Sequence, residues 1–324
     1  MRRGRTHRPG PRRTRRALGT GISVRGADAR TGAGRMSRHL GVVVLVALGL
    51  LGGGCSRVSL VYDNAPFLTA VYVDHRIDLA PQQLRRWTDR LEQVQTRHRR
   101  EALPRLTALL DGLILTSERG FAREDLACLM AAAEPIYRQH AELFVDATAP
   151  LLATLTPAQR QRLERLWRER DAERAAPADP ERERRKRARR YIRNLSDWTG
   201  PLSASQQQLV RELTAAMPRS QPALDAYRAD QRTRLMTLLD EGAGEARIAA
   251  FLHGWLVEFD AMPAALRRDG ERLTEQLVTL AARFGASLDA TQRTRLLERL
   301  GELRETLQRL QREQRAIVPL PCAG

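Results

Sequence analysis

Acidic and histidine side chains lie near the start of the predicted helical body, where they could serve acid–base catalysis or metal binding. Asp74, His75 and Asp78 precede the first predicted helix, and His98 and Glu101 lie three residues apart on it. Adjacent residues such as Asp74 and His75 point apart on a regular element. Helical metal bundles use Glu-x-x-His, whereas this chain has His-x-x-Glu. His98 falls on the apolar stripe of its helix, which favours a hydrogen-bonded core role. We therefore predict no catalytic residue, no metal site, no cofactor and no enzyme activity.

A different chemistry, attachment of lipid to a thiol, is suggested by Met36–Cys55. The segment begins with the basic residues Arg38 and His39, continues with the apolar run Leu40–Leu51, and has three glycines before the cysteine. A basic start, a short apolar core and small residues are typical of an export signal, which we place at residues 36–54. The apolar run is shorter than the roughly 20 residues that a membrane-spanning helix needs.

Cys55, directly after the glycines, resembles the bacterial lipobox cysteine, which is diacylated and becomes the mature N-terminus. Gly52 stands where that pattern usually has Leu, and the alternative is an ordinary signal peptide with a chance cysteine, or an uncleaved anchor. Ser56, the residue after the cysteine, resembles those of lipoproteins sorted to the outer membrane, because Asp at that position commonly marks retention in the inner membrane. We predict a periplasmic protein that is anchored to the outer membrane through lipid on Cys55.

The basic charge of the chain is concentrated before the export signal. Residues 1–35 carry 11 arginines and one acidic residue, as an arm that binds nucleic acid would. However, a complete signal begins only at Met36, so we interpret residues 1–35 as a non-native extension from an early start codon. The net charge of +17 falls to +6 from Cys55 onward, once the +10 of residues 1–35 and the charge of Arg38 are removed. This modest charge does not predict nucleic acid as a partner.

Acylation of Cys55 leaves two other cysteines, Cys128 and Cys322. Cys128 lies on an apolar helical stripe with Leu126 and Leu129, so we expect a buried thiol. A disulfide between Cys128 and Cys322 is the alternative in an oxidising periplasm. Two cysteines do not form a metal site.

The chain after residue 78 has the composition and the period of helices. Aromatic residues make up only 5% of the chain, and Leu, Ala, Arg, Glu and Gln dominate. Apolar residues recur every three or four positions, which predicts amphipathic helices. We predict an all-α fold, an elongated multi-helix bundle that follows a tether over residues 55–78. The predicted helices begin at Pro81 and after Pro104, then cover residues 121–148 with a kink or break near Pro135, 157–175, 203–217, 223–240, 245–262, 264–284 and 290–317.

A helix-start motif recurs four times along this body. In each copy a Leu precedes a short polar run in which a capping residue is followed three positions later by Gln. This spacing is a capping box, in which the first side chain accepts from an exposed amide and the Gln reaches back. The clear copies are Thr156 with Gln159, Ser203 with Gln206, and Asp289 with Gln292, and a weaker copy is Leu79–Gln83.

The spacing of the copies indicates an internal duplication. The first and second copies begin 76 residues apart, and the third and fourth begin 86 residues apart. The sequence LTPAQRQRLERL from Leu155 is also similar to LDATQRTRLLERL from Leu288. We interpret residues 79–175 and 202–317 as two helical units, joined by a basic linker and helix at 176–201 and followed by a tail at 318–324. Chance similarity between helices rich in Leu and Arg is the alternative.

Two resemblances accompany these patterns. The mature chain resembles an uncharacterised family of proteobacterial lipoproteins with a domain of unknown function, although Arg97 stands where that family usually has an aromatic residue. The Leu-Thr-x-x-Gln motif is similar to the signature of periplasmic helical chaperones and stress sensors of the Spy and CpxP kind, which implies a cradle for unfolded clients. The residues that carry the first resemblance are Cys55-Ser56, Leu60, Tyr62, Asn64, Asp74, Asp78-Leu79, Gln82 or Gln83, His98–Glu101, Leu103-Pro104 and Trp198–Ser203.

These observations favour a non-catalytic role at the cell envelope. We expect a lipid-anchored protein that binds an envelope protein client, in a chaperone-like or scaffold role. One alternative is an envelope enzyme, or an enzyme regulator, whose site is dispersed in the sequence. Another is a structural spacer. A binding groove would expose an apolar surface of several hundred Å², and an enzyme would cluster acids or histidines with shifted pKa values in a pocket.

Overall fold

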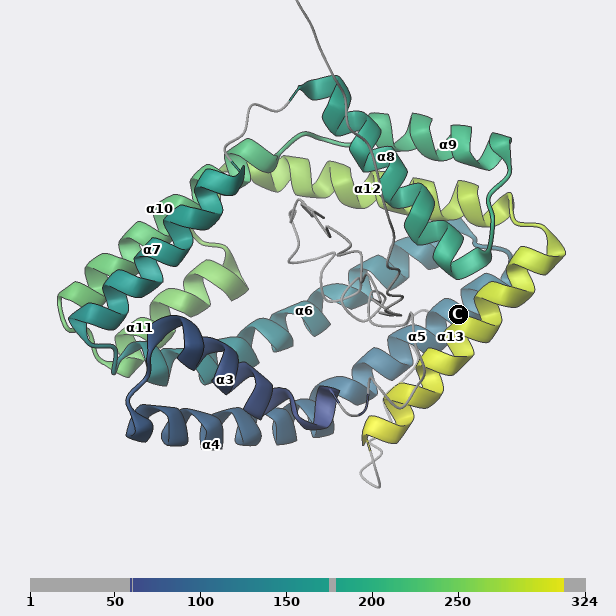
Figure 1. Cartoon of the computed structure of the whole chain (residues 1–324). Helices are drawn as coiled ribbons and strands as arrows, with labels where there is room; N and C mark the ends of the chain where they lie inside the picture. The colour runs from purple at the N-terminus through teal and green to yellow at the C-terminus, as the bar shows by residue number, and fades with distance from the viewer. Residues whose placement is uncertain (1–58, 60, 175–178, 312–324) are drawn as a thin grey trace, which may run out of the picture. The chain divides into compact units, whose positions relative to one another are not determined.

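The computed structural model describes residues 59, 61–174 and 179–311 (Figure 1). All of them belong to one compact unit, Arg35–Gly324. Every regular element among these residues is a helix and none is a strand, so the predicted all-α multi-helix fold is confirmed. The first five helices are α3 (Ala65–Ile77), α4 (Pro81–Arg97), α5 (Leu103–Arg119), α6 (Arg123–Leu152) and α7 (Pro157–Arg174).

Proline shapes the first helices in two ways. Pro81 and Pro157 lie at the first position of α4 and α7, where a missing amide costs nothing. Pro104 lies in the first turn of α5, which directly follows a π-helical turn, η1 (His98–Ala102). The interruption expected at Pro104 is therefore the π-helical turn η1, which connects α4 directly to α5. In contrast, α6 continues unbroken through Pro135.

The remaining helices follow a short gap in the described residues. Phe259, with φ of 56°, ends the region predicted as one helix over 245–262, so that region is shorter than expected. The elements are α8 (Pro180–Thr199), α9 (Ala204–Ala215), α10 (Gln221–Asp240), α11 (Glu245–His253), the π-helical turn η2 (Gly254–Glu258), α12 (Ala264–Ala286) and α13 (Ala290–Gln311).

The helices repeat one set of contacts in two series, α3–α7 and α8–α13. In the first series α3 packs against α4 and α7, and in the second α8 packs against α9 and α13. Likewise α4 packs against α6, and α9 against α12. The last helix of each series packs against the other series: α7 lies beside α10, and α13 beside α5 (Figure 1). The two series are therefore interleaved.

The contacts also change the predicted boundaries. Ala65–Ile77, which the sequence places in a tether, forms α3. Its residues Ala70 and Ile77 are buried in a core with Trp87. The basic stretch at 176–201, predicted as a linker and a helix, lies mostly on the helix α8, which packs against α9. Both series therefore start one helix earlier than the sequence motif suggests.

Two main cores hold these contacts. Each core contains the Leu residues that open two copies of the helix-start motif: Leu79 and Leu155 in the first core, and Leu202 and Leu288 in the second. All four are buried. The motif therefore places an apolar side chain in the core immediately before each of these helices begins.

Candidate functional site

The glutamines of the helix-start motif bind one another in pairs. In the second series the Gln206 Nε2 donates to the Gln292 Oε1 at 2.7 Å, and the Gln292 Nε2 donates to the Gln206 Oε1 at 3.1 Å. Each Nε2 also donates to the carbonyl before the partner's Leu: Gln206 to Ser287 at 2.9 Å and Gln292 to Pro201 at 2.8 Å. We call this reciprocal pair a glutamine clasp.

The first series repeats the clasp with Gln83 and Gln159. The Gln83 Nε2 donates to the Gln159 Oε1 at 3.1 Å, and the Gln159 Nε2 donates to the Gln83 Oε1 at 2.8 Å. The carbonyls of Thr154 and Asp78 accept the remaining donors, both at 2.7 Å. Of the two adjacent glutamines that the sequence leaves open, Gln83 is the one that forms the clasp.

The clasp glutamines also cap their own helices. Each Oε1 accepts from the backbone amide of its own N-cap residue. In return, a side-chain oxygen of the N-cap residue accepts from the backbone amide of the glutamine three positions later. This bond is present for Thr156 with Gln159, Ser203 with Gln206, and Asp289 with Gln292. Every clasp carboxamide therefore uses both N–H donors and accepts two hydrogen bonds. The sequence predicts the local capping, but it does not predict that the copies bind in pairs, because the partner lies 76 or 86 residues away.

A second polar cluster joins Tyr62, His98 and His140. The His98 Nε2 lies 3.0 Å from the His140 Nε2, and the His98 Nδ1 lies 2.8 Å from the Tyr62 hydroxyl. The His140 Nδ1 lies 2.7 Å from the Ile136 carbonyl, which can only accept, so this nitrogen donates. It follows that a neutral His140 accepts from the His98 Nε2, and that His98 accepts from Tyr62.

Burial keeps this chain of hydrogen bonds uncharged. Desolvation, together with the neighbouring His140 and Arg99, lowers the pKa of His98 to about 3. Desolvation also lowers the pKa of His140, and it raises the pKa of Tyr62 to about 12. The Arg99 guanidinium lies 5.3 Å from the centre of the Tyr62 ring and pairs with Asp63. The cluster fastens the segment before α3 to the start of η1, directly after α4, and to α6.

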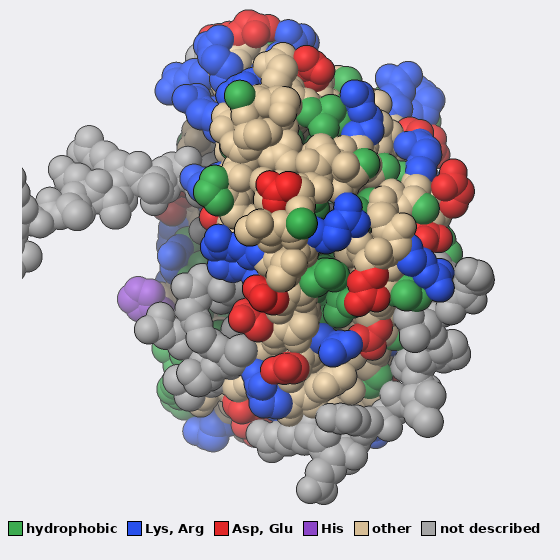
Figure 2. All heavy atoms as spheres, turned by 90° about the vertical axis from the view of Figure 1, so that its right-hand side faces the viewer, with side chains coloured by type: hydrophobic (Ala, Val, Ile, Leu, Met, Phe, Trp, Pro, Cys, Tyr) green, Lys and Arg blue, Asp and Glu red, His purple; other side chains and the backbone are tan. Residues whose placement is uncertain are grey.

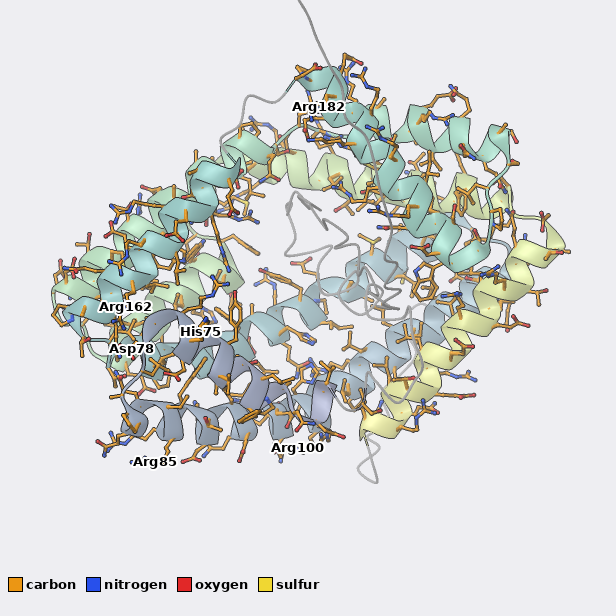
Figure 3. The ribbon with its side chains drawn as sticks, in the orientation of Figure 1. His75, Asp78, Arg85, Arg100, Arg162 and Arg182 are labelled. Carbon is orange, nitrogen blue, oxygen red and sulfur yellow. The ribbon has the colours of Figure 1, made fainter. Side chains whose placement is uncertain are left out.

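The other acid and histidine residues singled out in the sequence have separate partners. Asp74 accepts from the Leu79 amide at 2.9 Å, and Asp78 forms an ion pair with Arg162 (Figure 3). His75 is exposed on α3, and Glu101 pairs with arginines at the surface. The structure does not bring these residues together. Among the described residues, no group of three or more His, Cys, Asp or Glu is arranged to hold a metal ion.

The cysteine predictions have different outcomes. Cys128 is exposed and disulfide-bonded, so the expected buried thiol is wrong. Cys55, with its predicted lipid, lies outside the described residues, as do Ser56 and Cys322. The pairing of Cys128 with Cys322 therefore stays a prediction.

The basic run on α8 is largely engaged within the protein. Arg184 and Lys186 pair with glutamates three residues before them. Arg187 donates to the carbonyls of Met217 and Pro218, which lie just after α9. This run therefore serves partly to pack α8 against its neighbours. Its remaining charges form the solvent-exposed side of the helix, where Arg182 points outward (Figure 3).

Exposed large apolar side chains gather on one helix. On α3 and just before it, five such residues keep between 44% and 60% of their surface exposed: Val61, Phe67, Leu68, Val71 and Tyr72. Phe144 on α6 is the other one among the described residues. By contrast, Figure 2 shows the side of α13 and α9, where hydrophobic side chains are scattered between charged ones. We call the five residues the α3 apolar face.

None of the described helices combines the length and the apolar character that crossing a membrane requires. Comparison with known proteins gives one result: residues 75–255, more than half of the chain, match a family described as "Family of unknown function (DUF6279)". No curated protein and no solved structure matches.

Replacement of one clasp glutamine should destabilise the protein. We expect Gln206→Ala to lower the free energy of unfolding by about 2–3 kcal/mol, because it leaves buried groups of Gln292 and of the α9 N-terminus without partners. Urea unfolding followed by circular dichroism measures this. Gln208→Ala is the matched control, since Gln208 is exposed two positions later on the same helix. Equal effects of the two variants would contradict a role for the clasp.

Acid should destabilise the protein through the histidine cluster. The pKa of His98 in the folded protein lies below the pKa of a histidine in the unfolded chain. The unfolded state therefore binds more protons between about pH 6.5 and pH 3, and the free energy of unfolding decreases as the pH is lowered through this window. His98 alone should account for about 1–2 kcal/mol between pH 7 and pH 5. Urea midpoints at the two values should therefore differ less in His98→Gln than in the wild type. The exposed His75→Gln variant is the control and should show the same change in urea midpoint between pH 7 and pH 5 as the wild type. If His98→Gln also shows the full wild-type change, this explanation is wrong.

Proposed function

The chain belongs to the DUF6279 family of unknown function, and we propose that it is a lipid-anchored scaffold protein of the periplasm. In this proposal Cys55 carries the lipid, the outer membrane holds the anchor, and the interleaved helices form a body that binds an envelope protein. The body performs no reaction of its own.

The observation that carries the proposal is the position of the α3 apolar face. Val61 is the sixth residue after Cys55, and the other members of the face follow within the next eleven positions. Monomeric proteins rarely leave several large apolar side chains together on the surface unless the surface meets a membrane or a partner. The predicted site of acylation and the exposed apolar surface thus fall within one short stretch of the chain.

The internal use of the polar side chains supports a scaffold role. Asp74 and Asp78 fix the turn between α3 and α4, and His98 holds Tyr62. The clasp glutamines likewise join helix starts. Asp74, Asp78 and His98, which could perform acid–base chemistry, therefore have positioning roles, and the histidine chain ends on a backbone carbonyl, which cannot take up a proton.

Labelling of cells with palmitate tests the anchor. The wild type should incorporate the label, Cys55→Ala should lose it, and Cys322→Ala should keep it. Acylation of Cys55 also leaves Cys322 as the partner for Cys128 within one chain, so peptide mapping without reduction should recover that pair. An unlabelled wild type, or a disulfide between Cys128 and Cys55, would contradict the proposal.

Crosslinking in intact cells tests the scaffold role. The wild type, crosslinked and then purified under denaturing conditions, should yield a small and reproducible set of envelope proteins by mass spectrometry. Cys55→Ala, which should lose the membrane position, serves as the control for chance capture. If the wild type and Cys55→Ala yield the same proteins, the capture is by chance, and the scaffold role is wrong. If the wild type yields none, the result likewise favours a structural spacer without partners.

A further inference from the structure

The α3 apolar face suggests how the body sits on the membrane. Phe67, Leu68, Val71 and Tyr72 follow the i, i+1, i+4, i+5 spacing of one helix face. The opposite side of α3 carries the buried residues Pro66, Ala70 and Ile77. Up to Tyr72 the helix is therefore apolar on both sides, and packing within the protein uses only one of them. The exposed His75, four residues after Val71, continues that side with a polar residue.

The short stretch of chain between Cys55 and the α3 apolar face indicates that a lipid surface covers this face. Six residues from Cys55 to Val61 span at most about 20 Å, even when fully extended. Acyl chains on Cys55 must lie in the bilayer, so the start of α3 cannot be far from the head groups. A helix of 13 residues that packs on the body through one side can lie flat in this boundary region with the other side.

The polar groups around the face fit the same surface. The Arg76 guanidinium lies 5.1 Å from the centre of the Tyr72 ring, and Arg170 of α7 donates to the Tyr72 hydroxyl at 3.2 Å. An aromatic ring with its polar end beside cations suits the head-group region, where anionic phosphates are available. The acid on α3, Asp74, is turned away into its bond with the Leu79 amide.

We propose that the α3 apolar face inserts into the head-group boundary of the bilayer that holds the lipid anchor, and thereby fixes the orientation of the helical body. This inference rests on the proposed lipid anchor. The acyl chains supply the attachment, whereas α3 determines which side of the body faces the periplasm.

Quenching by brominated lipids tests the insertion. The full lipidated protein is reconstituted in vesicles of phosphatidylethanolamine and phosphatidylglycerol, with or without bromine on the acyl chains. Leu68→Trp and Val71→Trp each add a tryptophan at an exposed position of the face, and wild-type emission is subtracted. Both should lose most of the added emission in brominated vesicles. Gln208→Trp on α9 is the control and should lose none, because α9 packs against α8 and α12 and lies across the body from α3 (Figure 1).

The outcomes separate this inference from the anchor. If the protein sediments with the vesicles but the tryptophans at 68 and 71 are quenched no more than that at 208, insertion is wrong and the anchor stands. A blue-shifted but unquenched emission would show that a protein surface, such as a second copy, covers the face, and it would also overturn insertion. A wild type that does not sediment with the vesicles would overturn both proposals.

Discussion

The structure depends on the reciprocal hydrogen bonds of two glutamine pairs. A helix N-terminus has amides without partners inside the helix, and burial of such groups is costly unless a side chain binds them. Only a carboxamide can accept from the cap amide, donate to an identical partner and donate to a carbonyl at once. Glutamate could cap a helix, but two facing carboxylates would repel each other and have no donor for the carbonyls of Pro201 and Ser287. The chemistry of the clasp therefore requires carboxamides, not carboxylates, at these positions.

The clasps have consequences for the whole body. Each clasp joins the starts of two helices of one series, α4 with α7 and α9 with α13. The second helix of each pair then packs against the other series. A clasp thus holds in place one of the helices that pack against the other series, as α6 also does against α11 and α12, and the buried Leu before each motif ties that junction to a core. The result is a body whose polar motif residues hold helices together, which leaves the α3 apolar face as the notable exposed feature.

Local sequence predicted most of this fold but only part of the site. Composition, apolar period and capping residues predicted the helical class and the starts of α4, α7 and α13. They missed α3, because apolar residues on both of its sides give no clear amphipathic pattern. They also placed His98 in a core without identifying His140, which lies 42 residues away and is brought near by α6. Pairing between motif copies was likewise beyond local rules, although the matched gaps of 76 and 86 residues were a signal that the copies come in pairs.

A double-mutant cycle between Gln206 and Gln292 tests whether the two side chains bind each other. The free energies of unfolding of the wild type, Gln206→Ala, Gln292→Ala and the double variant give the coupling energy between the two side chains. If the glutamines bind each other as the structure shows, the double variant should lose about 1–2 kcal/mol less than the sum of the single losses. Strictly additive losses would mean that each Gln only caps its own helix, and they would contradict the clasp as the basis of the fold.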